Sequence, residues 1–233
     1  MKQLPSADVY LQEYEYWPWG KLIRDLISKV SDCAPKNGTV LDAICGPGYL
    51  LGKIKENRPD LDCTGFDISR PYIRHAEKSF PENHYFVQDA LTWRPKKKYD
   101  IVLCTSGVHH ISYDRQSDLI AKLATSTKKK GKCIIADPII GFYNDEKGRQ
   151  LAAAKFGQWN LATVIKRGAP PEIIATALDV MHNDVMGEEY KDSLSHLYCL
   201  YRDHFNRVSF RAHTGSKKAG GDFSFTCTHE DFW

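Results

Sequence analysis

The sequence predicts an α/β fold: a doubly wound, seven-stranded, mostly parallel sheet with an antiparallel last strand. Three observations predict it. From residue 39 onwards, short apolar segments alternate with segments of helical periodicity. The first apolar segment runs directly into the glycine turn Gly46-Pro47-Gly48 and then into a helix. The last two strand-like segments are separated only by the turn 215–221, which suits an antiparallel hairpin.

Composition narrows the class of protein. A chain of 233 residues is long enough for one sizeable core, so we expect a single domain over residues 1–233. The seven cysteines are odd in number and lack zinc-ligand spacing, so we expect neither disulfides nor a metal site. Residues 1–8 lack the apolar core of a signal peptide, and no apolar run reaches the length of about 18 residues that a membrane span needs. We therefore expect a cytoplasmic protein without a membrane partner.

The charge pattern does not indicate a nucleic-acid partner. The formal net charge is only +3. Two lysine runs, 96–98 and 128–130, each precede a predicted strand and so lie at the strands' N-terminal edge. Ligands of open α/β sheets bind at the opposite edge, beyond the carboxyl ends of the strands. We therefore read the lysines as solvated turn residues. The oligomeric state stays open.

Residues 1–38 are predicted to form a helical N-terminal cap, because Leu22, Leu26 and Val30 recur at helical spacing. This segment is rich in aromatic residues: Tyr14, Tyr16, Trp17 and Trp19. Two roles remain open for them, which are core packing against the sheet and a flap over a bound ligand.

The later elements follow in order. The predicted strands are 39–42, 62–67, 84–91, 99–106, 132–137, 207–213 and 223–229, and Asp137-Pro138 is expected to break the fifth of them. Helices are predicted after Gly48, from Ser69, over about 114–125 and over 194–205. Residues 141–189 are predicted to form a helical insert, with helices over 151–156, 161–165 and 172–181. This insert is either a substrate lid or a cover for a sheet edge.

The glycine turn admits two classes of cofactor. A dinucleotide places its pyrophosphate at the helix N-terminus, which favours G-x-G-x-x-G without a nearby negative charge. Here the glycines stand at Gly46, Gly48 and Gly52, so the spacing is off by one. Asp42 would repel a diphosphate but attract the ammonium group of an amino-acid-like ligand. The turn therefore favours S-adenosylmethionine (SAM) over NAD, and an NAD(P)-dependent oxidoreductase is the alternative.

The string Val40-Leu-Asp-Ala-Ile-Cys-Gly-Pro-Gly48 closely resembles the first motif of class I SAM-dependent methyltransferases, with Ile44 in place of a glycine. Residues 99–111, which end in His109-His110, resemble the fourth motif of small-molecule methyltransferases such as the ubiquinone/menaquinone group. The resemblance implies a Rossmann-like methyltransferase fold. It also implies in-line transfer of a methyl group from SAM to an O or N atom of a small-molecule acceptor. A non-methylating SAM-binding member of the fold is a further alternative.

The resemblance also implies roles for single residues. Asp67 would bind the ribose hydroxyls of SAM, and Asp89 would accept a hydrogen bond from the adenine amino group. The predicted cofactor-binding residues are Asp42, Cys45, Gly46, Gly48, Asp67, Ile68, Asp89, Ala90, Thr105 and Tyr16. No [DNS]-P-P-[YFW] motif of nucleic-acid amino-methylating enzymes follows the fourth strand, which supports a small-molecule acceptor.

Methyl transfer from a sulfonium mainly requires alignment of the reactants and exclusion of water. A hydroxyl or ammonium acceptor must also lose a proton, and a neutral histidine is suited to accept it. His109 and His110 are the candidates for this general base, although they could instead only shape the pocket. Predicted substrate contacts are Trp19, Tyr143, Trp159 and His182. We expect the N-terminal aromatic segment and the 141–189 insert to form a closing cover that cofactor binding orders.

Overall fold

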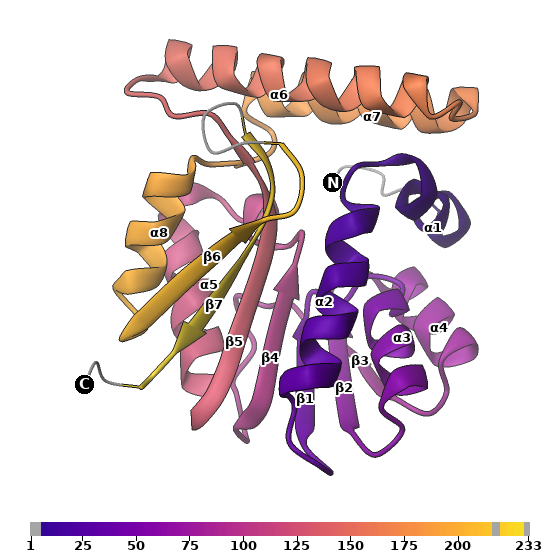
Figure 1. Ribbon diagram of the computed structural model, residues 1–233, viewed down its shortest axis with the longest axis vertical. Coiled ribbons are helices and arrows are strands. Elements are labelled where there is room, and N and C mark those ends of the chain that lie inside the picture. The colour runs from indigo at the N-terminus through magenta and orange to yellow at the C-terminus, as the bar shows by residue number, and fades with distance from the viewer. Residues whose placement is uncertain (1–5, 216–219, 231–233) are drawn as a thin grey trace.

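The structure is a computed structural model that describes residues 6–215 and 220–230. Its strands are β1 (Thr39–Ala43), β2 (Asp62–Asp67), β3 (His84–Val87), β4 (Tyr99–Thr105), β5 (Thr127–Ile140), β6 (Arg207–Ala212) and β7 (Gly220–Thr228). Its helices are α1 (Ala7–Tyr16), α2 (Gly20–Cys33), α3 (Tyr49–Asn57), α4 (Arg70–Ser79), α5 (Tyr113–Ser126), α6 (Glu146–Lys166), α7 (Pro171–Met186) and α8 (Leu194–Arg202), with the 3₁₀ helix η1 (Val108–His110). The strands form one sheet with helices on both faces (Figure 1).

The strands are arranged in the order β3-β2-β1-β4-β5-β7-β6. The first five pair in parallel. Strand β7 lies antiparallel between β5 and β6. The predicted fold class is therefore confirmed, including the antiparallel last strand and the hairpin that carries it. Residues 216–219 of the predicted hairpin turn lie outside the described residues.

Central strands of this sheet are apolar on both faces because helices cover both. Strand β4 shows the pattern. Val102 and Cys104 belong to the hydrophobic cluster under α5 and α8, whereas Ile101 and Leu103 belong to the cluster under α2 and α3. All four side chains are at most 1% exposed. The near-continuous apolar run of this strand follows from that double burial.

The prediction that Asp137-Pro138 breaks the fifth strand is wrong, because β5 continues to Ile140. The carbonyl of Ala136 accepts the N–H of Ser106, so even-numbered residues of β5 face β4. Pro138 also faces that side, two residues beyond the last pairing with β4. Its missing N–H therefore leaves no gap in a ladder. On the other side, pairing with β7 runs on to Ile140.

Two other predicted boundaries are wrong. The third strand ends at Val87 and not at residue 91, because the chain turns at Asp89, whose carbonyl accepts the N–H of Trp93 (2.9 Å). The helices predicted at 151–156 and 161–165 are one continuous helix, α6. Gly157 lies within it without breaking it. A Cβ there would approach the side chain of Met181 on α7 to 2.3 Å, so this glycine allows the two helices to pack closely.

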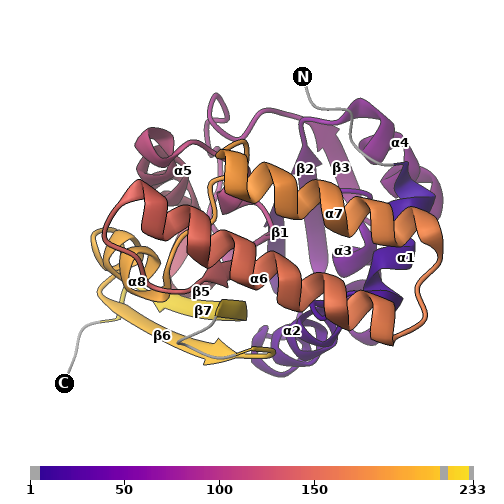
Figure 2. The ribbon, with the colours of Figure 1, turned by 90° about the horizontal axis from the view of Figure 1, so that it is seen from above.

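Helices α6 and α7 lie side by side across the carboxyl end of the sheet (Figures 1 and 2). Helix α1 lies below the far end of this pair, between α7 and the loop that joins β1 to α3. The predicted helical N-terminal segment and helical insert are therefore both present, at the edge where ligands of such sheets bind. None of the helices in the described part of the chain has an apolar stretch of the length that a bilayer crossing needs.

Candidate active site

The loop between β1 and α3 is a tight turn that contains three residues with positive φ: Ile44 (+63°), Gly46 (+54°) and Gly48 (+82°). Two hydrogen bonds hold it against β2. The N–H of Cys45 donates to the carbonyl of Phe66, and the N–H of Gly46 donates to Oδ2 of Asp67, both at 2.9 Å. Cys45 is 8% exposed, and its thiol contacts the carbonyl of Gly46. The turn thus lies directly against the carboxyl end of β2.

Gly48 and Ile44 both have positive φ angles, but glycine adopts such an angle without strain and isoleucine does not. A Cβ at Gly48 would lie 2.7 Å from Cβ of Ala76 and 2.8 Å from the hydroxyl of Tyr85, so only glycine fits there. Ile44 is β-branched, and its left-handed backbone costs about 1–3 kcal/mol. Its side chain reaches the loop after β4, where a Cβ at Gly107 would lie 3.1 Å from Cδ1 of Ile44. Ile44 therefore joins the two loops at the carboxyl edge.

Three carboxyl groups are buried near the turn. Asp42 is 2% exposed, and its Oδ1 has no hydrogen-bond partner among the described residues. Burial raises the pKa of Asp42 to about 8, and the charge of Asp67 adds to the rise. Asp67 accepts the N–H of Ser69 (2.8 Å) in addition to the turn N–H, yet burial raises its pKa as well. Burial also raises the pKa of Glu13, on α1, to about 8. Such acids favour a cationic or hydroxyl-bearing ligand.

The other predicted cofactor residues lie around the ends of β2, β3 and β4. The carboxylate of Asp89 accepts the N–H of Leu91 (2.8 Å), and Ala90 is buried between them in the chain. Ile68 is 66% exposed and offers an apolar surface beside Asp67. Oγ1 of Thr105 is buried and has no partner among the described side chains and backbone groups.

Helix α1 covers the turn with aromatic rings. Tyr14 stacks on Tyr49, the first residue of α3, with 4.4 Å between ring centroids. Tyr10 lies closest to the turn, because a Cβ on Gly46 would be 3.8 Å from its ring. Burial raises the pKa of both α1 tyrosines, so they are neutral phenols. They are four residues apart and so share one face of the helix.

Tyr16 lies on a different face of α1 from these two tyrosines. It packs with Val164 and Ile173, which belong to the cluster formed by α6 and α7. The guanidinium of Arg167 donates to the carbonyls of Tyr16 (3.2 Å) and Trp17 (2.8 Å). The structure therefore places Tyr16 against the insert, while Tyr10 and Tyr14 lie nearer the glycine turn. The sequence prediction named Tyr16 from this segment and did not name Tyr10 or Tyr14, because it did not resolve which face of the helix each tyrosine occupies.

The two predicted catalytic histidines lie in η1, directly after β4. His109 is 8% exposed, and its Nδ1 bonds to the carboxylate of Asp137 on β5. Its Nε2 lies 3.4 Å from Oε2 of Glu189. Nδ1 of His110 lies 3.0 Å from the same oxygen. We call these four residues the histidine–acid cluster.

Burial and neighbouring charges set the protonation of this cluster. Burial lowers the pKa of His109, and the positive charges of His110 and Lys191 lower it further, against the opposing effect of Asp137. Burial alone would raise the pKa of Glu189. The hydrogen bond from His110 and the neighbouring positive charges outweigh that effect, so the pKa of Glu189 lies well below its usual range. The pKa of His109 and the pKa of Glu189 therefore both lie below their usual values.

Buried polar contacts hold the segment after α7 against η1. Lys191 and Asp184, each at most 4% exposed, form an ion pair at 2.5 Å. The buried guanidinium of Arg149 donates to the carbonyl of Asp184 (2.7 Å). The N–H of Tyr190 donates to the carbonyl of His109 (2.8 Å). These contacts bring Glu189, which is distant in sequence, to the histidines.

The four predicted substrate residues are Trp19, Tyr143, Trp159 and His182, and the structure does not bring them together. Trp19 is buried and stacks on Tyr14, with 4.9 Å between ring centroids. The hydroxyl of Tyr143 donates to Asp192 (2.7 Å). Trp159 is 36% exposed on α6, and His182 is exposed on α7.

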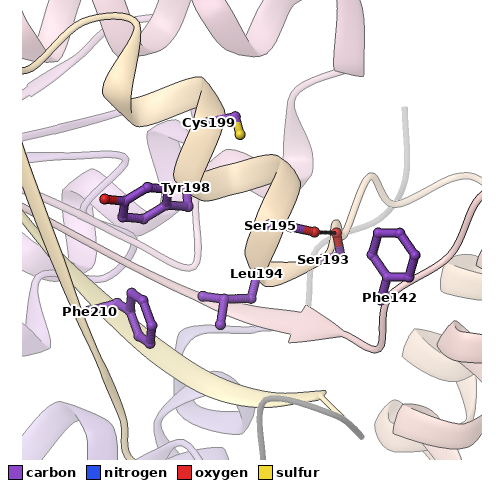
Figure 3. A pocket seen from close by; sticks show the side chains of 7 residues that line it. All are labelled: Phe142, Ser193, Leu194, Ser195, Tyr198, Cys199 and Phe210. Atoms are coloured by element: carbon purple, nitrogen blue, oxygen red, sulfur yellow. Dashed lines mark hydrogen bonds between the residues drawn. The ribbon is translucent and has the colours of Figure 1, made fainter.

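A pocket of about 390 Å³ lies between α8, β6 and the segment that follows β5 (Figure 3). Leu194, Tyr198 and Cys199 line it from α8, and Phe210 and Phe142 line it from either side. None of the residues predicted from the sequence to bind cofactor or substrate lines this pocket. Its walls carry no acid, base or cation, so we do not place the chemistry there.

The chain matches the family described as methyltransferase domain over residues 12–167. It belongs to that family. One curated relative is a trans-aconitate 2-methyltransferase of Mycobacterium marinum, which is 27% identical over 120 residues. The matched residues cover 52% of this chain and 43% of that protein. A demethylmenaquinone methyltransferase of Thermotoga maritima is also 27% identical over 120 residues, which cover 51% of this chain and 49% of that protein. The chain spans less than half the length of these relatives.

Solved structures share the fold of this methyltransferase-family chain. An O-methyltransferase family protein from Burkholderia thailandensis superposes with a TM-score of 0.60 at 15% identity, covering 91% of this chain and 57% of that one. Magnesium protoporphyrin IX methyltransferase from Synechocystis, crystallised with bound SAM, gives a TM-score of 0.58 at 14% identity, covering 91% of this chain and 80% of that one. At these identities the likeness establishes the fold.

The sequence analysis did not single out three residues that the structure places beside predicted site residues. Asp137 could have been found, because it lies near the end of a strand, as Asp42, Asp67 and Asp89 do. Tyr10 could have been found from its helical spacing to Tyr14. Glu189 gave no signal in the sequence, since only the tertiary contacts of its loop bring it to the histidines.

Proposed function

We propose that this protein transfers a methyl group from SAM to an O or N atom of a small-molecule acceptor. The observation that carries the proposal is the buried Asp42 carboxyl, whose Oδ1 lacks a partner among the described residues beside the glycine turn. The ammonium group of SAM would satisfy that oxygen, whereas a diphosphate would meet two buried acids, Asp42 and Asp67. The names of the curated relatives, which refer to small-molecule acceptors, support the same class of substrate.

The residues at the carboxyl edge fit SAM. Asp42 would hold its ammonium group. Each oxygen of Asp67 accepts one backbone N–H and retains a lone pair for a ribose hydroxyl. Asp89 and the exposed Ile68 would meet the adenine, and the unpartnered hydroxyl of Thr105 offers a further polar contact.

When bound, SAM supplies a methyl group on a sulfonium centre that an acceptor atom displaces in line. The chain's own residues then have to align the acceptor, exclude water and remove a proton. His109 would be the general base, because burial lowers its pKa and the bond to Asp137 fixes its orientation. His110 is the second candidate, since it is 47% exposed and can exchange protons with solvent.

We further propose that α1 and the α6–α7 pair form a cover over bound cofactor. The two segments contact each other through Tyr16 and Arg167, and α1 also contacts the glycine turn through Tyr10. Binding of S-adenosylhomocysteine should therefore increase protection from hydrogen exchange in α1, α6 and α7. If protection increases only in the loops after Asp42, Asp67 and Asp89, the cover is static packing.

Calorimetric titrations with S-adenosylhomocysteine and with NADH test the proposed function. We expect S-adenosylhomocysteine to bind and NADH not to bind, because the turn carries a buried acid where a diphosphate would lie. Binding of NADH alone would favour an oxidoreductase. Release of S-adenosylhomocysteine from SAM in the presence of hydroxyl or amino acceptors then separates a methyltransferase from a non-methylating member of the fold.

A further inference from the structure

We propose that His109, His110 and Glu189 bind a divalent transition-metal ion, and that this ion takes an oxygen atom of the methyl acceptor at an open coordination position. The second part of this inference rests on the proposed function; the first part does not. The residues come from two distant segments, η1 and the loop after α7.

The geometry of the three side chains suits one cation. One ligand atom from each residue lies within 4.8 Å of the others. Nε2 of His109 and Nδ1 of His110 lie 3.4 and 3.0 Å from the same carboxylate oxygen of Glu189. Bonds of about 2.0–2.2 Å from a central ion to imidazole nitrogen and carboxylate oxygen span such separations. Small side-chain adjustments would therefore place all three atoms around one ion.

The contacts of His109 leave one of its ring nitrogens directed at Glu189. Nδ1 of His109 bonds to the carboxylate of Asp137. Nε2, on the other side of the ring, lies 3.4 Å from Oε2 of Glu189. Nδ1 of His110 approaches the same oxygen. A divalent ion between these atoms would take Nε2 of His109, Nδ1 of His110 and the carboxylate of Glu189 as its ligands.

Asp137 completes the arrangement found around metal-bound histidines. Such histidines commonly donate their second ring N–H to a carboxylate, which fixes the tautomer and the direction of the lone pair. The backbone N–H of Val108 donates to the other oxygen of Asp137 (3.2 Å), so this carboxylate is itself held in place. On the opposite side, the N–H of Tyr190 donates to the carbonyl of His109, which holds the Glu189 loop against η1.

The ligand set indicates the class of metal and its use. Two imidazoles and one carboxylate are typical of zinc and other divalent first-row ions at sites with an open position. A hydroxyl oxygen bound at that position would release its proton to solvent water at a lower pH than the free hydroxyl does, which prepares the oxygen to attack a methyl group. With the ion bound, this activation would take the place of His109 acting as a general base. η1 directly follows β4, so the cluster lies at the carboxyl edge of the sheet, where the proposed cofactor residues also lie. We infer an acceptor with a metal-binding hydroxyl or enol oxygen.

Titration with Co²⁺, followed by its visible absorption, and competition with Zn²⁺ test the inference on chelator-treated protein without a polyhistidine tag. We expect one ion per chain. Asp137→Asn removes a partner of a ligand and should weaken Co²⁺ binding by roughly 10- to 100-fold. Glu189→Gln and His110→Ala each remove a ligand and should weaken Co²⁺ binding by more than this. Addition of acetohydroxamate, a small oxygen chelator, should change the Co²⁺ spectrum of the wild-type protein.

His196→Ala is the matched control, because His196 also bonds to a carboxylate, Asp192 (2.7 Å), outside the cluster. If Glu189→Gln does not fold, His110→Ala carries the test, since His110 is 47% exposed. Absence of stoichiometric binding, or binding that these variants leave unchanged, would overturn the metal site. An unchanged spectrum with acetohydroxamate would overturn the acceptor role. Methyl transfer by protein that binds no metal would support the proposed function and overturn the metal site. Metal binding without methyl transfer would support the metal site and count against the proposed function.

Discussion

Replacing His109 by alanine should lower the rate of methyl transfer by about 10²-fold or more, with little change in SAM affinity. The variant removes the buried imidazole that faces Glu189 and is oriented by Asp137. Its loss therefore removes the group that takes the acceptor's proton or holds the ion that activates it. SAM affinity should persist, because the ring bonds to Asp137 and faces Glu189, and among the described residues no hydrogen bond or ion pair joins it to the glycine turn or its acids. Single-turnover rates and calorimetric titration with SAM measure the two quantities separately.

His196→Ala serves as the control, since it removes a carboxylate-bonded histidine from α8 and should leave both quantities unchanged. His110→Ala adds a comparison within the cluster. A His109→Ala variant that loses SAM binding but turns over normally at saturating SAM would contradict a role in the reaction. It would show instead that the histidine shapes the cofactor pocket.

Replacing Asp42 by asparagine should weaken binding of S-adenosylhomocysteine by about 10- to 100-fold, because a buried charge-assisted hydrogen bond contributes roughly 1.5–3 kcal/mol. The wild-type affinity should also depend on pH. Burial raises the pKa of Asp42 to about 8, so in the free protein the group is mainly protonated at neutral pH. The ligand's ammonium group requires the ionised form. Affinity should therefore increase by about tenfold per unit between roughly pH 6 and 7, with one proton released per ligand bound.

Calorimetry in buffers of different ionisation enthalpy measures that proton release directly. The asparagine variant should bind weakly and with little pH dependence over the same range. Asp32→Asn, on the exposed surface of α2, is the control and should behave as the wild type. Wild-type affinity that is independent of pH would mean that Asp42 is not the ammonium partner.

The sequence predicts the elements whose signals are local. Asp42 is the penultimate residue of β1 and Asp67 is the last residue of β2, so in neighbouring parallel strands both lie near the same edge of the sheet. Pro138 shows the limit of local reasoning. Whether its missing N–H matters depends on where β4 stops, which no property of residues 132–140 reveals. The same limit applies to α6, which the sequence analysis divided into two short helices, whereas Gly157 between them serves close packing against Met181.

The histidine–acid cluster could be predicted only in part. His109 and His110 follow a strand at the carboxyl edge and match a known motif, so sequence alone indicates them. The position of Glu189 depends on the buried Lys191–Asp184 ion pair, on Arg149 and on a backbone hydrogen bond to η1. These are tertiary contacts, which join the segment after α7 to α6, α7 and η1. No periodicity or motif within residues 187–193 encodes them.

The position of β7 between β5 and β6 has a consequence for how the protein folds. Strand β7 follows every other strand in the sequence, yet it pairs with β5 on one side and β6 on the other. During synthesis, β5 therefore presents an open edge and β6 has no partner until residues 220–228 leave the ribosome. The unpaired backbone groups of an open strand edge can pair with a strand of another chain and so promote aggregation. Slow translation or truncation before β7 should thus make nascent chains dependent on chaperones.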